Sequence, residues 1–241
     1  MTRCVFDGTY DGLMTLVFDT WNMKEALGEV CEWGGRESFL PEWYFPHDSA
    51  KARRVKAYIA DTLGSEFALM AREAFLSRHE SRFRAIVRTI HLSTPMGAKV
   101  LHLLHDDVLD FIACQRETRR EAHRFKGLLR FRGMRDGSLL AVFAPRSNVL
   151  TLVLPHFAER FPEERLLLYD EGRGLAGLAG QGRVEFVRVE SLTPQEAGNE
   201  AELQGLWRVF FSSLAIKERT NPRLQQQHLP KYTWKNLTEM Q

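Results

Sequence analysis

The chain has 241 residues, 44% hydrophobic and 11% aromatic, which suits a globular protein long enough to bury a core. No apolar run approaches about 18 residues, which excludes a membrane-spanning helix. The N-terminal segment has an acid within its first seven residues and no long apolar stretch, which argues against a secretory signal. Three scattered cysteines without a Cys-x-x-Cys pair argue against zinc or iron–sulfur ligation and fit a reducing cytoplasm. We therefore expect no cofactor, no membrane association and a cytoplasmic location.

The first half of the chain has the pattern of one strand followed by helices. Residues 3–6 predict a strand, and Thr9 is a candidate N-cap for the helix that follows. Residues 31–49 contain glycines, prolines and aromatics, which predict a loop that packs on the domain. Residues 49–126 show apolar stripes at helical spacing, which predict helices, and Gly127 is a natural C-cap.

The second half changes to strand-like patterns. Residues 128–134 and 138–145 predict a hairpin, and Ser147 is a candidate N-cap for a helix over 148–161. The remaining predicted elements are two strands separated by glycine-rich turns, a long helix and an irregular tail: 165–169, 184–189, 194–217 and 222 onwards.

This order of elements does not form a β-α-β alternation and predicts an α+β fold. The N-terminal half is expected to be mainly helical. The C-terminal half is expected to combine an antiparallel, hairpin-containing sheet with helices. We expect a single domain over 1–241, with a subdivision into a helical part, 1–126, and a sheet-plus-helix part, 127–241, as the alternative.

The net charge of +2 hides an uneven distribution. Residues 116–135 hold eight bases against two acids, and residues 217–235 hold five against one. The rest holds 20 bases against 28 acids. A polyanion-binding face produces such asymmetry, and so do two chance clusters. The candidate nucleic-acid-binding residues are Arg116, Arg120, Arg124, Lys126, Arg130, Arg132, Arg219, Arg223, Trp234 and Lys235.

These residues have a definite predicted geometry. Arg116, Arg120 and Arg124 are four apart and share one helix face, whereas Arg130 and Arg132 share one face of a strand. A guanidinium group can donate two hydrogen bonds to the oxygens of one phosphate, and the aromatic side chains of the C-terminal tail can stack on bases. The alternatives are a solvated charged surface and a tail whose aromatic residues fold back on the core.

Five residues are candidate catalytic groups: Glu121, His123, His156, Asp170 and Arg173. Glu121 and His123 diverge by about 200° on a helix, so either would need a partner from elsewhere. Asp170 and Arg173 follow a predicted strand, where an acid fits metal-dependent phosphoryl chemistry or a turn with a solvated aspartate. His102 and His105 precede two aspartates, but without a second ligand pair a polar helix surface is preferred and no metal site is expected.

Seven segments in chain order together carry a family resemblance: Phe6–Tyr10, Glu121–Gly127, Arg130–Phe131, His156–Phe161, Tyr169–Asp170, Arg219–Gln225 and Pro230–Lys235. They resemble a bacterial domain-of-unknown-function family whose members are labelled probable DNA metabolism proteins. In that family the gene usually lies beside a radical-SAM protein related to spore photoproduct lyase. The domain also occurs fused to a uracil-DNA-glycosylase-like domain. The resemblance implies DNA repair or modification and a radical-SAM partner that would hold the iron–sulfur cluster, and it implies no catalytic residue.

Three functions follow as expectations. The first is a DNA-binding accessory protein that acts with a radical-SAM partner in DNA repair or modification. The second is an enzyme acting on DNA, a hydrolase or base-processing activity, with a site around Glu121, His123 and Asp170. The third is a purely protein-binding partner subunit that docks through residues 31–49. We expect the first.

Overall fold

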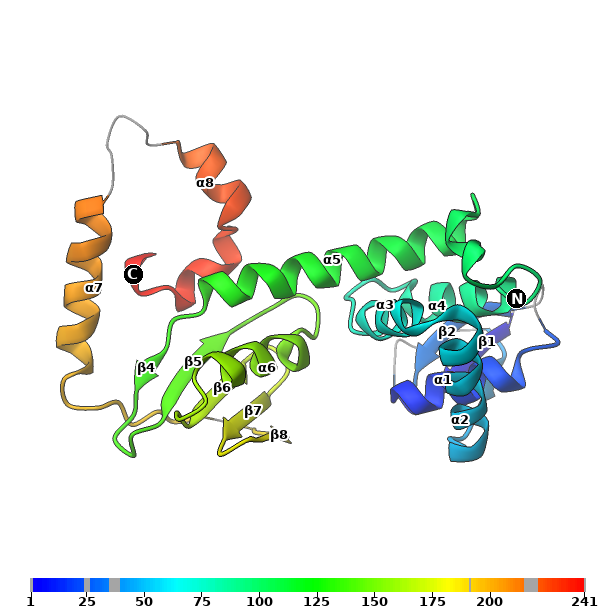
Figure 1. The fold of residues 1–241 in the computed structure, drawn as a ribbon, viewed down its shortest axis with the longest axis horizontal. Helices are drawn as coiled ribbons and strands as arrows, with labels where there is room; N and C mark the ends of the chain where they lie inside the picture. Colours follow the sequence, from blue (N-terminus) through cyan, green and yellow to red (C-terminus); the bar gives the residue numbers. More distant parts are fainter. Residues whose placement is uncertain (1, 24–26, 35–39, 191, 215–220, 241) are drawn as a thin grey trace. The chain divides into compact units, whose positions relative to one another are not determined.

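The chain has two compact units, residues 1–120 and 121–241, in a computed structural model that describes residues 2–23, 27–34, 40–190, 192–214 and 221–240. The division falls inside helix α5 (Asp106–Leu128). Both units, called here the N-terminal and C-terminal units, contain helices and strands, so the predicted α+β class is confirmed (Figure 1). No helix in the described part of the chain is long and apolar enough to cross a membrane.

The N-terminal unit contains a parallel sheet with the order β2-β1-β3 among the described strands. Helix α1 connects β1 to the parallel strand β2, which makes a β-α-β unit. The sequence-based expectation that the chain contains no β-α-β alternation is therefore wrong for this segment. The elements before the helical region are β1 (Thr2–Phe6), α1 (Tyr10–Asp19), β2 (Leu27–Glu32) and β3 (Glu42–Tyr44).

The predicted helical region is confirmed, and its apolar faces form the core of this unit. Phe67 stacks on Phe111 with ring centroids 5.3 Å apart, and Ile86 is fully buried. The elements are α2 (Ser49–Tyr58), a π-helical turn (Ile59–Leu63), α3 (Ser65–Phe75), α4 (Arg82–Leu92), a 3-10 helix (Gly97–His102) and α5.

The predicted loop 31–49 is partly wrong. Strand β2 ends inside it and β3 lies within it, because both strands pair with β1. The expected packing of its aromatics fails at Trp33, Trp43 and Tyr44, whose exposed fractions are 69%, 48% and 50%. Residues 35–39 of this predicted loop lie outside the described residues.

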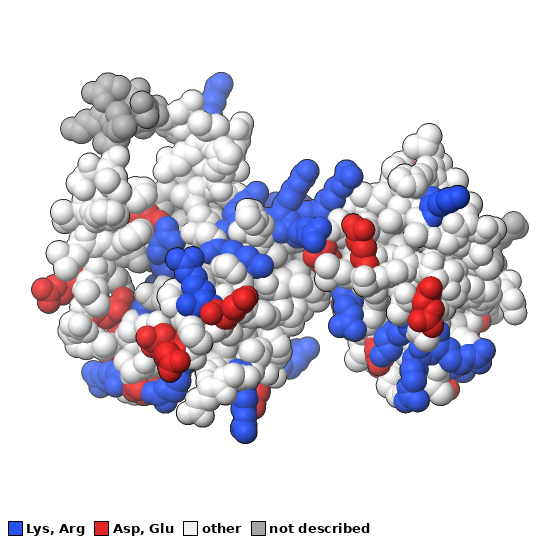
Figure 2. All heavy atoms as spheres, viewed as in Figure 1, with Lys and Arg blue, Asp and Glu red and all other residues white. Residues whose placement is uncertain are grey.

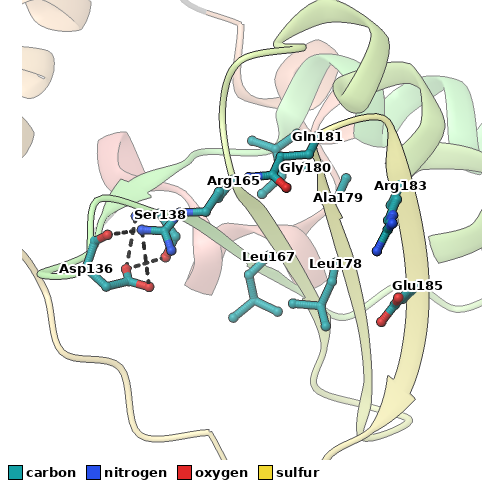
Figure 3. A pocket seen from close by; sticks show the side chains of 11 residues that line it. Asp136, Ser138, Arg165, Leu167, Leu178, Ala179, Gly180, Gln181, Arg183 and Glu185 are labelled. Carbon is teal, nitrogen blue, oxygen red and sulfur yellow. Dashed lines mark hydrogen bonds and ion pairs between the residues drawn. The ribbon is translucent and has the colours of Figure 1, made fainter.

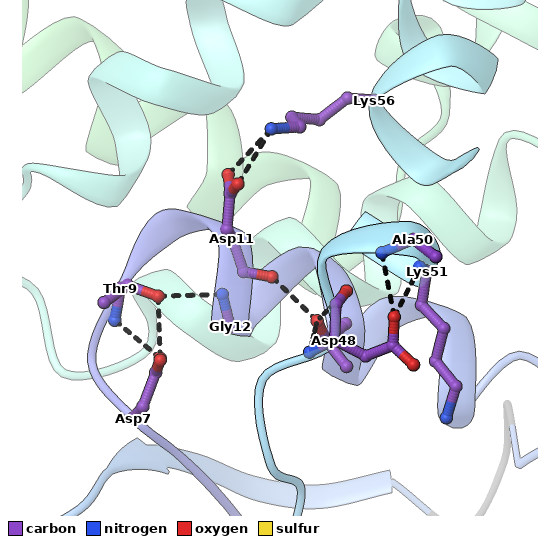
Figure 4. Close-up of polar contacts among 9 residues, drawn as sticks. Asp7, Thr9, Asp11, Gly12, Asp48, Ala50, Lys51 and Lys56 are labelled. Atoms are coloured by element: carbon purple, nitrogen blue, oxygen red, sulfur yellow. Dashed lines mark hydrogen bonds and ion pairs between the residues drawn. The ribbon is translucent and has the colours of Figure 1, made fainter. Parts of the chain in front are cut away.

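Short polar side chains fix the starts of α1 and α2 (Figure 4). The Thr9 hydroxyl accepts the backbone N–H of Gly12 at 2.9 Å, which confirms the predicted N-cap. The Asp7 carboxylate accepts the Thr9 N–H at 2.9 Å and the Thr9 hydroxyl at 2.8 Å. A Cβ atom on Gly12 would lie 1.9 Å from Asp7 Oδ1, so only glycine allows this approach. Asp48 caps α2 in the same way.

The C-terminal unit contains a mixed sheet with the order β4-β5-β6-β7-β8 among its described strands. Strands β5 and β6 are parallel and joined by helix α6, whereas the other neighbours are antiparallel. The β5-α6-β6 connection is a second β-α-β unit, against the sequence-based expectation. The elements are β4 (Arg132–Gly133), β5 (Leu139–Phe143), α6 (Leu150–Arg160), β6 (Leu166–Asp170), β7 (Leu175–Gly180) and β8 (Arg183–Arg188).

The predicted hairpin is confirmed as the antiparallel β4–β5 pair, but its first strand is shorter than predicted. Helix α5 continues through Gly127 to Leu128, so Gly127 is not a C-cap. Tertiary packing explains the extension, because Phe125 contacts Phe143 of β5 with ring centroids 5.1 Å apart.

Strand β7 occupies a segment for which the sequence predicts glycine-rich turns. Helix α6 packs against β6 and β7 (Figure 1). A Cβ atom on Gly177 would lie 2.7 Å from Leu154 Cδ2 of α6. Gly177 is therefore a close-packing site and not a turn signal.

The C-terminal tail is also more regular than predicted. It contains helix α8 (Pro222–His228), whose N-cap Asn221 accepts the Leu224 N–H at 3.1 Å. Two short 3-10 helices follow, Lys231–Asn236 and Thr238–Met240. The predicted long helix is present as α7 (Glu200–Leu214).

Candidate functional site

Glu121 on α5 is the centre of a buried polar cluster in the C-terminal unit. Its exposed fraction is 5%, and its carboxylate accepts three hydrogen bonds. The donors are the backbone N–H of Arg146 at 2.9 Å, that of Ser147 at 2.8 Å and the Tyr232 hydroxyl at 2.9 Å. Burying a carboxylate is costly unless hydrogen bonds replace its hydration. These three donors do so, and they fix the turn that follows β5.

Asp170 lies at the end of β6 and is fully buried. Its carboxylate accepts a hydrogen bond from Arg173 Nη1 at 2.8 Å and from the backbone N–H of Gly172 at 3.1 Å. Burial raises the pKa of Asp170, and the pairing with Arg173 opposes this rise. The aspartate does cap a turn, but the solvated side chain expected from the sequence is wrong.

The turn 145–147 joins these two carboxylate groups. Glu121 binds its N–H groups, whereas Arg173 donates to the carbonyl oxygens of Pro145, at 3.0 Å, and of Arg146. The structure therefore brings together three of the five candidate catalytic residues, Glu121, Asp170 and Arg173. They hold the loop between the parallel strand β5 and helix α6.

The two candidate histidines do not join this cluster. His123 is exposed on α5, as expected from its angular separation from Glu121. His156 lies on α6 beside Phe157. Among the described residues, no hydrogen bond links either histidine to Glu121 or Asp170. In the N-terminal unit, His105 Nδ1 lies 3.7 Å from a carboxylate oxygen of Asp107, which also pairs with Arg84 and Arg88.

Two polar atoms beside the turn remain unsatisfied. Ser147 Oγ and Asn148 Oδ1 are buried without a hydrogen-bond partner in the described part of the chain. The predicted capping role of Ser147 is wrong, because α6 begins after Val149 and has no side-chain cap. Unsatisfied buried groups are uncommon in folded proteins, so these two atoms offer hydrogen-bonding capacity at the start of α6.

Exposed arginines lie along α5. Arg116 and Arg120 share one face, and neither forms an ion pair with a described residue. Arg119, beside them, lies 3.5 Å from a Glu73 carboxylate oxygen. In Figure 2 the blue Lys and Arg side chains gather over the middle of this helix. The predicted arginine face of α5 therefore includes two guanidinium groups free for an external anion.

Arg124, in the C-terminal unit, lies beside Tyr232. The Arg124 side chain lies close enough to the Tyr232 hydroxyl to oppose the rise in its pKa, and the Arg146 guanidinium lies 4.7 Å from the Tyr232 ring centroid. Burial and then the neighbouring Glu121 carboxylate raise the pKa of Tyr232. The hydroxyl therefore stays protonated at neutral pH and donates to Glu121. Sequence reasoning named Tyr232 only as a tail aromatic and missed Arg146, since nothing in its local pattern distinguishes it.

Other candidate nucleic-acid-binding residues are engaged within the C-terminal unit. Arg130 pairs with Glu239 at 2.5 Å and lies over the Trp207 ring. Arg132 pairs with Glu196 at 3.1 Å.

Among the candidate nucleic-acid-binding residues of the C-terminal tail, some have partners within the C-terminal unit and others are exposed. Lys235 pairs with Glu171 at 2.8 Å, and the Trp234 indole donates to the Leu229 carbonyl at 2.9 Å. The alternative interpretation, a tail whose Tyr232 and Trp234 fold back on the core, holds for Tyr232, which packs against the apolar core of the C-terminal unit. Arg223 is exposed on α8, Lys126 is half-buried, and Arg219 lies outside the described residues.

A separate pocket of about 430 Å³ lies on the sheet of the C-terminal unit (Figure 3). Asp136 and Ser138 lie on one side of it, Arg183 and Glu185 on the other, and Leu167 and Leu178 between them. Arg165 bonds Asp136 at its edge. None of the site residues predicted from the sequence is among the described residues that line this pocket, so the pocket is separate from the Glu121 cluster.

Residues 80–239 match the family described as a domain of unknown function, DUF4130. This range contains Glu121, Asp170, Arg173 and Tyr232. No curated protein and no solved structure matches the chain.

Proposed function

The chain belongs to the family of the domain of unknown function DUF4130, and from this starting point we propose that it binds DNA as an accessory protein of DNA repair or modification. The single observation that supports DNA binding most directly is the exposed pair Arg116 and Arg120 on α5, without an ion-pair partner among the described residues. Like charges four residues apart repel each other on a helix. The negative charge of a phosphate backbone reduces that repulsion, and a phosphate group can accept two parallel hydrogen bonds from one guanidinium group.

The binding surface consists of Arg116 and Arg120 on α5, and Arg124, which belongs to the C-terminal unit, is left out because its side chain lies beside Tyr232. Arg130, Arg132, Trp234 and Lys235 are left out of the proposed contact because their polar groups have partners in the C-terminal unit. DNA binding thus depends on fewer residues than the charge pattern alone suggests.

A radical-SAM protein is the proposed partner, in the cytoplasm. This element of the proposal is supported only by the family resemblance of the sequence motifs. The iron–sulfur chemistry belongs to the partner, and this chain supplies DNA binding.

The enzymatic alternative receives less support. Glu121 and Asp170 are buried, and their carboxylate oxygens bond to groups that hold the 145–147 turn and the C-terminal tail. A general base needs free access to a substrate proton. In the proposed function these carboxylates are structural.

A protein-binding role is a second candidate, favoured by the exposure of Trp33, Trp43 and Tyr44 in the N-terminal unit. Exposed aromatic patches are typical of protein interfaces. Co-purification with the radical-SAM protein after nuclease treatment tests it. Loss of co-purification in Trp33→Ala/Trp43→Ala, with DNA affinity unchanged, would support this role, and an unchanged yield would reject it.

The DNA-binding proposal is tested by fluorescence anisotropy with labelled single-stranded and duplex oligonucleotides at low salt. Arg116→Ala/Arg120→Ala is expected to weaken affinity by about tenfold or more, since two charge-assisted contacts are lost. The matched control is Arg53→Ala/Arg188→Ala, which removes the same charge from exposed positions on α2 and β8. Absence of binding to either DNA, or equal weakening by both double variants, would reject the proposal.

A further inference from the structure

The N-terminal unit contains a pocket that the proposed function does not use. It has a volume of about 390 Å³ and lies where the ends of α1 and α2 meet. Pockets that bind small molecules measure about 300–1,000 Å³. Its lining consists of three aromatic rings, one aliphatic residue and two polar side chains: Phe18, Trp21, Tyr58, Val55, Asn22 and Arg54.

The aromatic walls are held in place by contacts behind them. The Trp21 ring packs edge-on against Tyr58 and His91, with centroid distances of 5.6 Å and 5.3 Å. The Tyr58 hydroxyl is hydrogen-bonded to Ser93 Oγ at 3.0 Å. His91 Nε2 lies 3.0 Å from the Val17 carbonyl oxygen in the buried core. The pocket is therefore preorganised, which lowers the entropy cost of binding a rigid ligand.

Neither polar side chain of the pocket has a hydrogen-bond or ion-pair partner among the described residues. The Arg54 guanidinium lies 4.8 Å from the centroid of the Phe18 ring and has no carboxylate partner there. The Asn22 side chain is exposed and forms no hydrogen bond with any described residue. The pocket therefore places one cationic group and one amide beside aromatic rings. The amide can both donate and accept hydrogen bonds.

We propose that this pocket binds a nucleobase that carries a phosphate. Aromatic rings and an arginine plane stack on any base, because every base has a π-face. The Asn22 amide matches a base edge, which presents a donor beside an acceptor. Arg54 then pairs with the phosphate, which a purely apolar ligand would not offer. Binding of a metal ion does not fit the described lining, because none of the described residues around the pocket offers a carboxylate.

This site is independent of the proposed DNA contact. Its residues precede residue 80 and so lie outside the family match, and none of them is on α5. The base has two sources: a free nucleotide or an unpaired base of a DNA strand. Both present the same ring and phosphate chemistry.

The experiment titrates the full chain with the four deoxynucleoside monophosphates, with oligo(dT) and with inorganic phosphate. Calorimetry gives affinities, and the indole N–H resonance of Trp21 reports binding at the pocket. Arg54→Ala and Asn22→Ala change exposed side chains, so they leave the core intact. Arg53→Ala is the matched control, because Arg53 is the exposed neighbour of Arg54 on α2 and does not line the pocket.

The proposal expects saturable binding of a monophosphate or of oligo(dT), with a shift of the Trp21 resonance. Arg54→Ala is expected to weaken it by about tenfold, whereas Arg53→Ala leaves it unchanged. Binding of the mononucleotides assigns a free nucleotide as ligand, and binding of oligo(dT) alone assigns an unpaired strand. No binding of any base-containing probe, equal loss in both arginine variants, or equal affinity for inorganic phosphate would overturn it. Arg116→Ala/Arg120→Ala leaves mononucleotide binding intact, which separates this site from the DNA contact on α5.

Discussion

The hydroxyl of Tyr232 donates a 2.9 Å hydrogen bond to the carboxylate of Glu121, 111 positions earlier in the chain. This contact ties the C-terminal 3-10 helix to α5. Because Glu121 also binds the N–H groups of Arg146 and Ser147, a single buried carboxylate holds the tail, the helix and the turn after β5. The C-terminal unit therefore depends on a charged group for its organisation as well as on its apolar core.

Replacing Tyr232 with Phe tests this connection. The variant keeps the ring and removes one of three donors to a buried carboxylate, so the free energy of unfolding is expected to fall by about 1–3 kcal/mol. Urea denaturation measures the change. Tyr44→Phe is the control, because Tyr44 is exposed and its hydroxyl has no hydrogen bond with a described residue. Equal stability of the two variants would show that the Tyr232 contact contributes nothing.

Glu121→Gln separates a structural from a catalytic role. The amide places a donor among three donors, so the free energy of unfolding is expected to fall by about 1–3 kcal/mol. Glu185→Gln on the exposed strand β8 is the control and is expected to change stability by less than about 0.5 kcal/mol. A fully stable Glu121→Gln variant with reduced DNA processing would contradict the structural assignment.

Glu239 gives the protein a defined sensitivity to acid. Burial opposes ionisation, but hydrogen bonds from Arg130 and Trp207 outweigh it and lower the pKa of Glu239 from 4.5. A lowered pKa in the folded state means that the stabilisation is fully present above pH 4.5 and is lost as the pH falls through the lower folded value.

The urea midpoint of the wild type should therefore fall more steeply below pH 4.5 than that of Glu239→Gln. Measurements between neutral pH and about pH 3 cover the range in which this carboxylate protonates. Parallel curves for the two proteins would contradict the assigned pairing of Glu239 with Arg130.

The cysteines report on the core of the N-terminal unit. Burial, with a smaller effect of Cys31, raises the pKa of Cys4 to about 11, and burial also raises those of Cys31 and Cys114. Since the thiolate is the reactive form, iodoacetamide should modify all three slowly in the native protein at pH 8 and rapidly after unfolding. Mass spectrometry of the modified peptides measures both rates. Rapid native modification of Cys4 would contradict the packing of β1.

Local features of the fold were predictable from the sequence because the interacting residues are neighbours. Thr9 caps α1 through Gly12, three residues away, and the β4–β5 hairpin forms around a short turn. Strand β7 was not predictable, since Gly177 signals a turn in the sequence. Only the proximity of Leu154 from α6 explains why a glycine occupies this strand.

The candidate site was predictable in its residue types but not in its pairings. Glu121, Asp170 and Arg173 were recognisable as unusual polar residues. Their shared contact, the turn 145–147, lies 25 and 26 residues from Glu121 and has no local signal.

Counting charges along the sequence identified basic segments but not which of their residues are paired in the folded chain. Counting charges could not distinguish Arg130, which is paired with Glu239 across 109 positions, from Arg116, which has no ion-pair partner in the described part of the chain. Only the folded chain shows which arginines remain available to a phosphate.

The salt dependence of DNA affinity tests the central claim most directly. Each phosphate contact contributes about 0.9 to the slope of log K against log salt for duplex DNA. The wild type should show a steep negative slope, and Arg116→Ala/Arg120→Ala should reduce its magnitude by about 1.8. The Arg53→Ala/Arg188→Ala control should keep the wild-type slope. An affinity that does not vary with salt, or a slope unchanged by loss of Arg116 and Arg120, would contradict DNA binding by this face of α5.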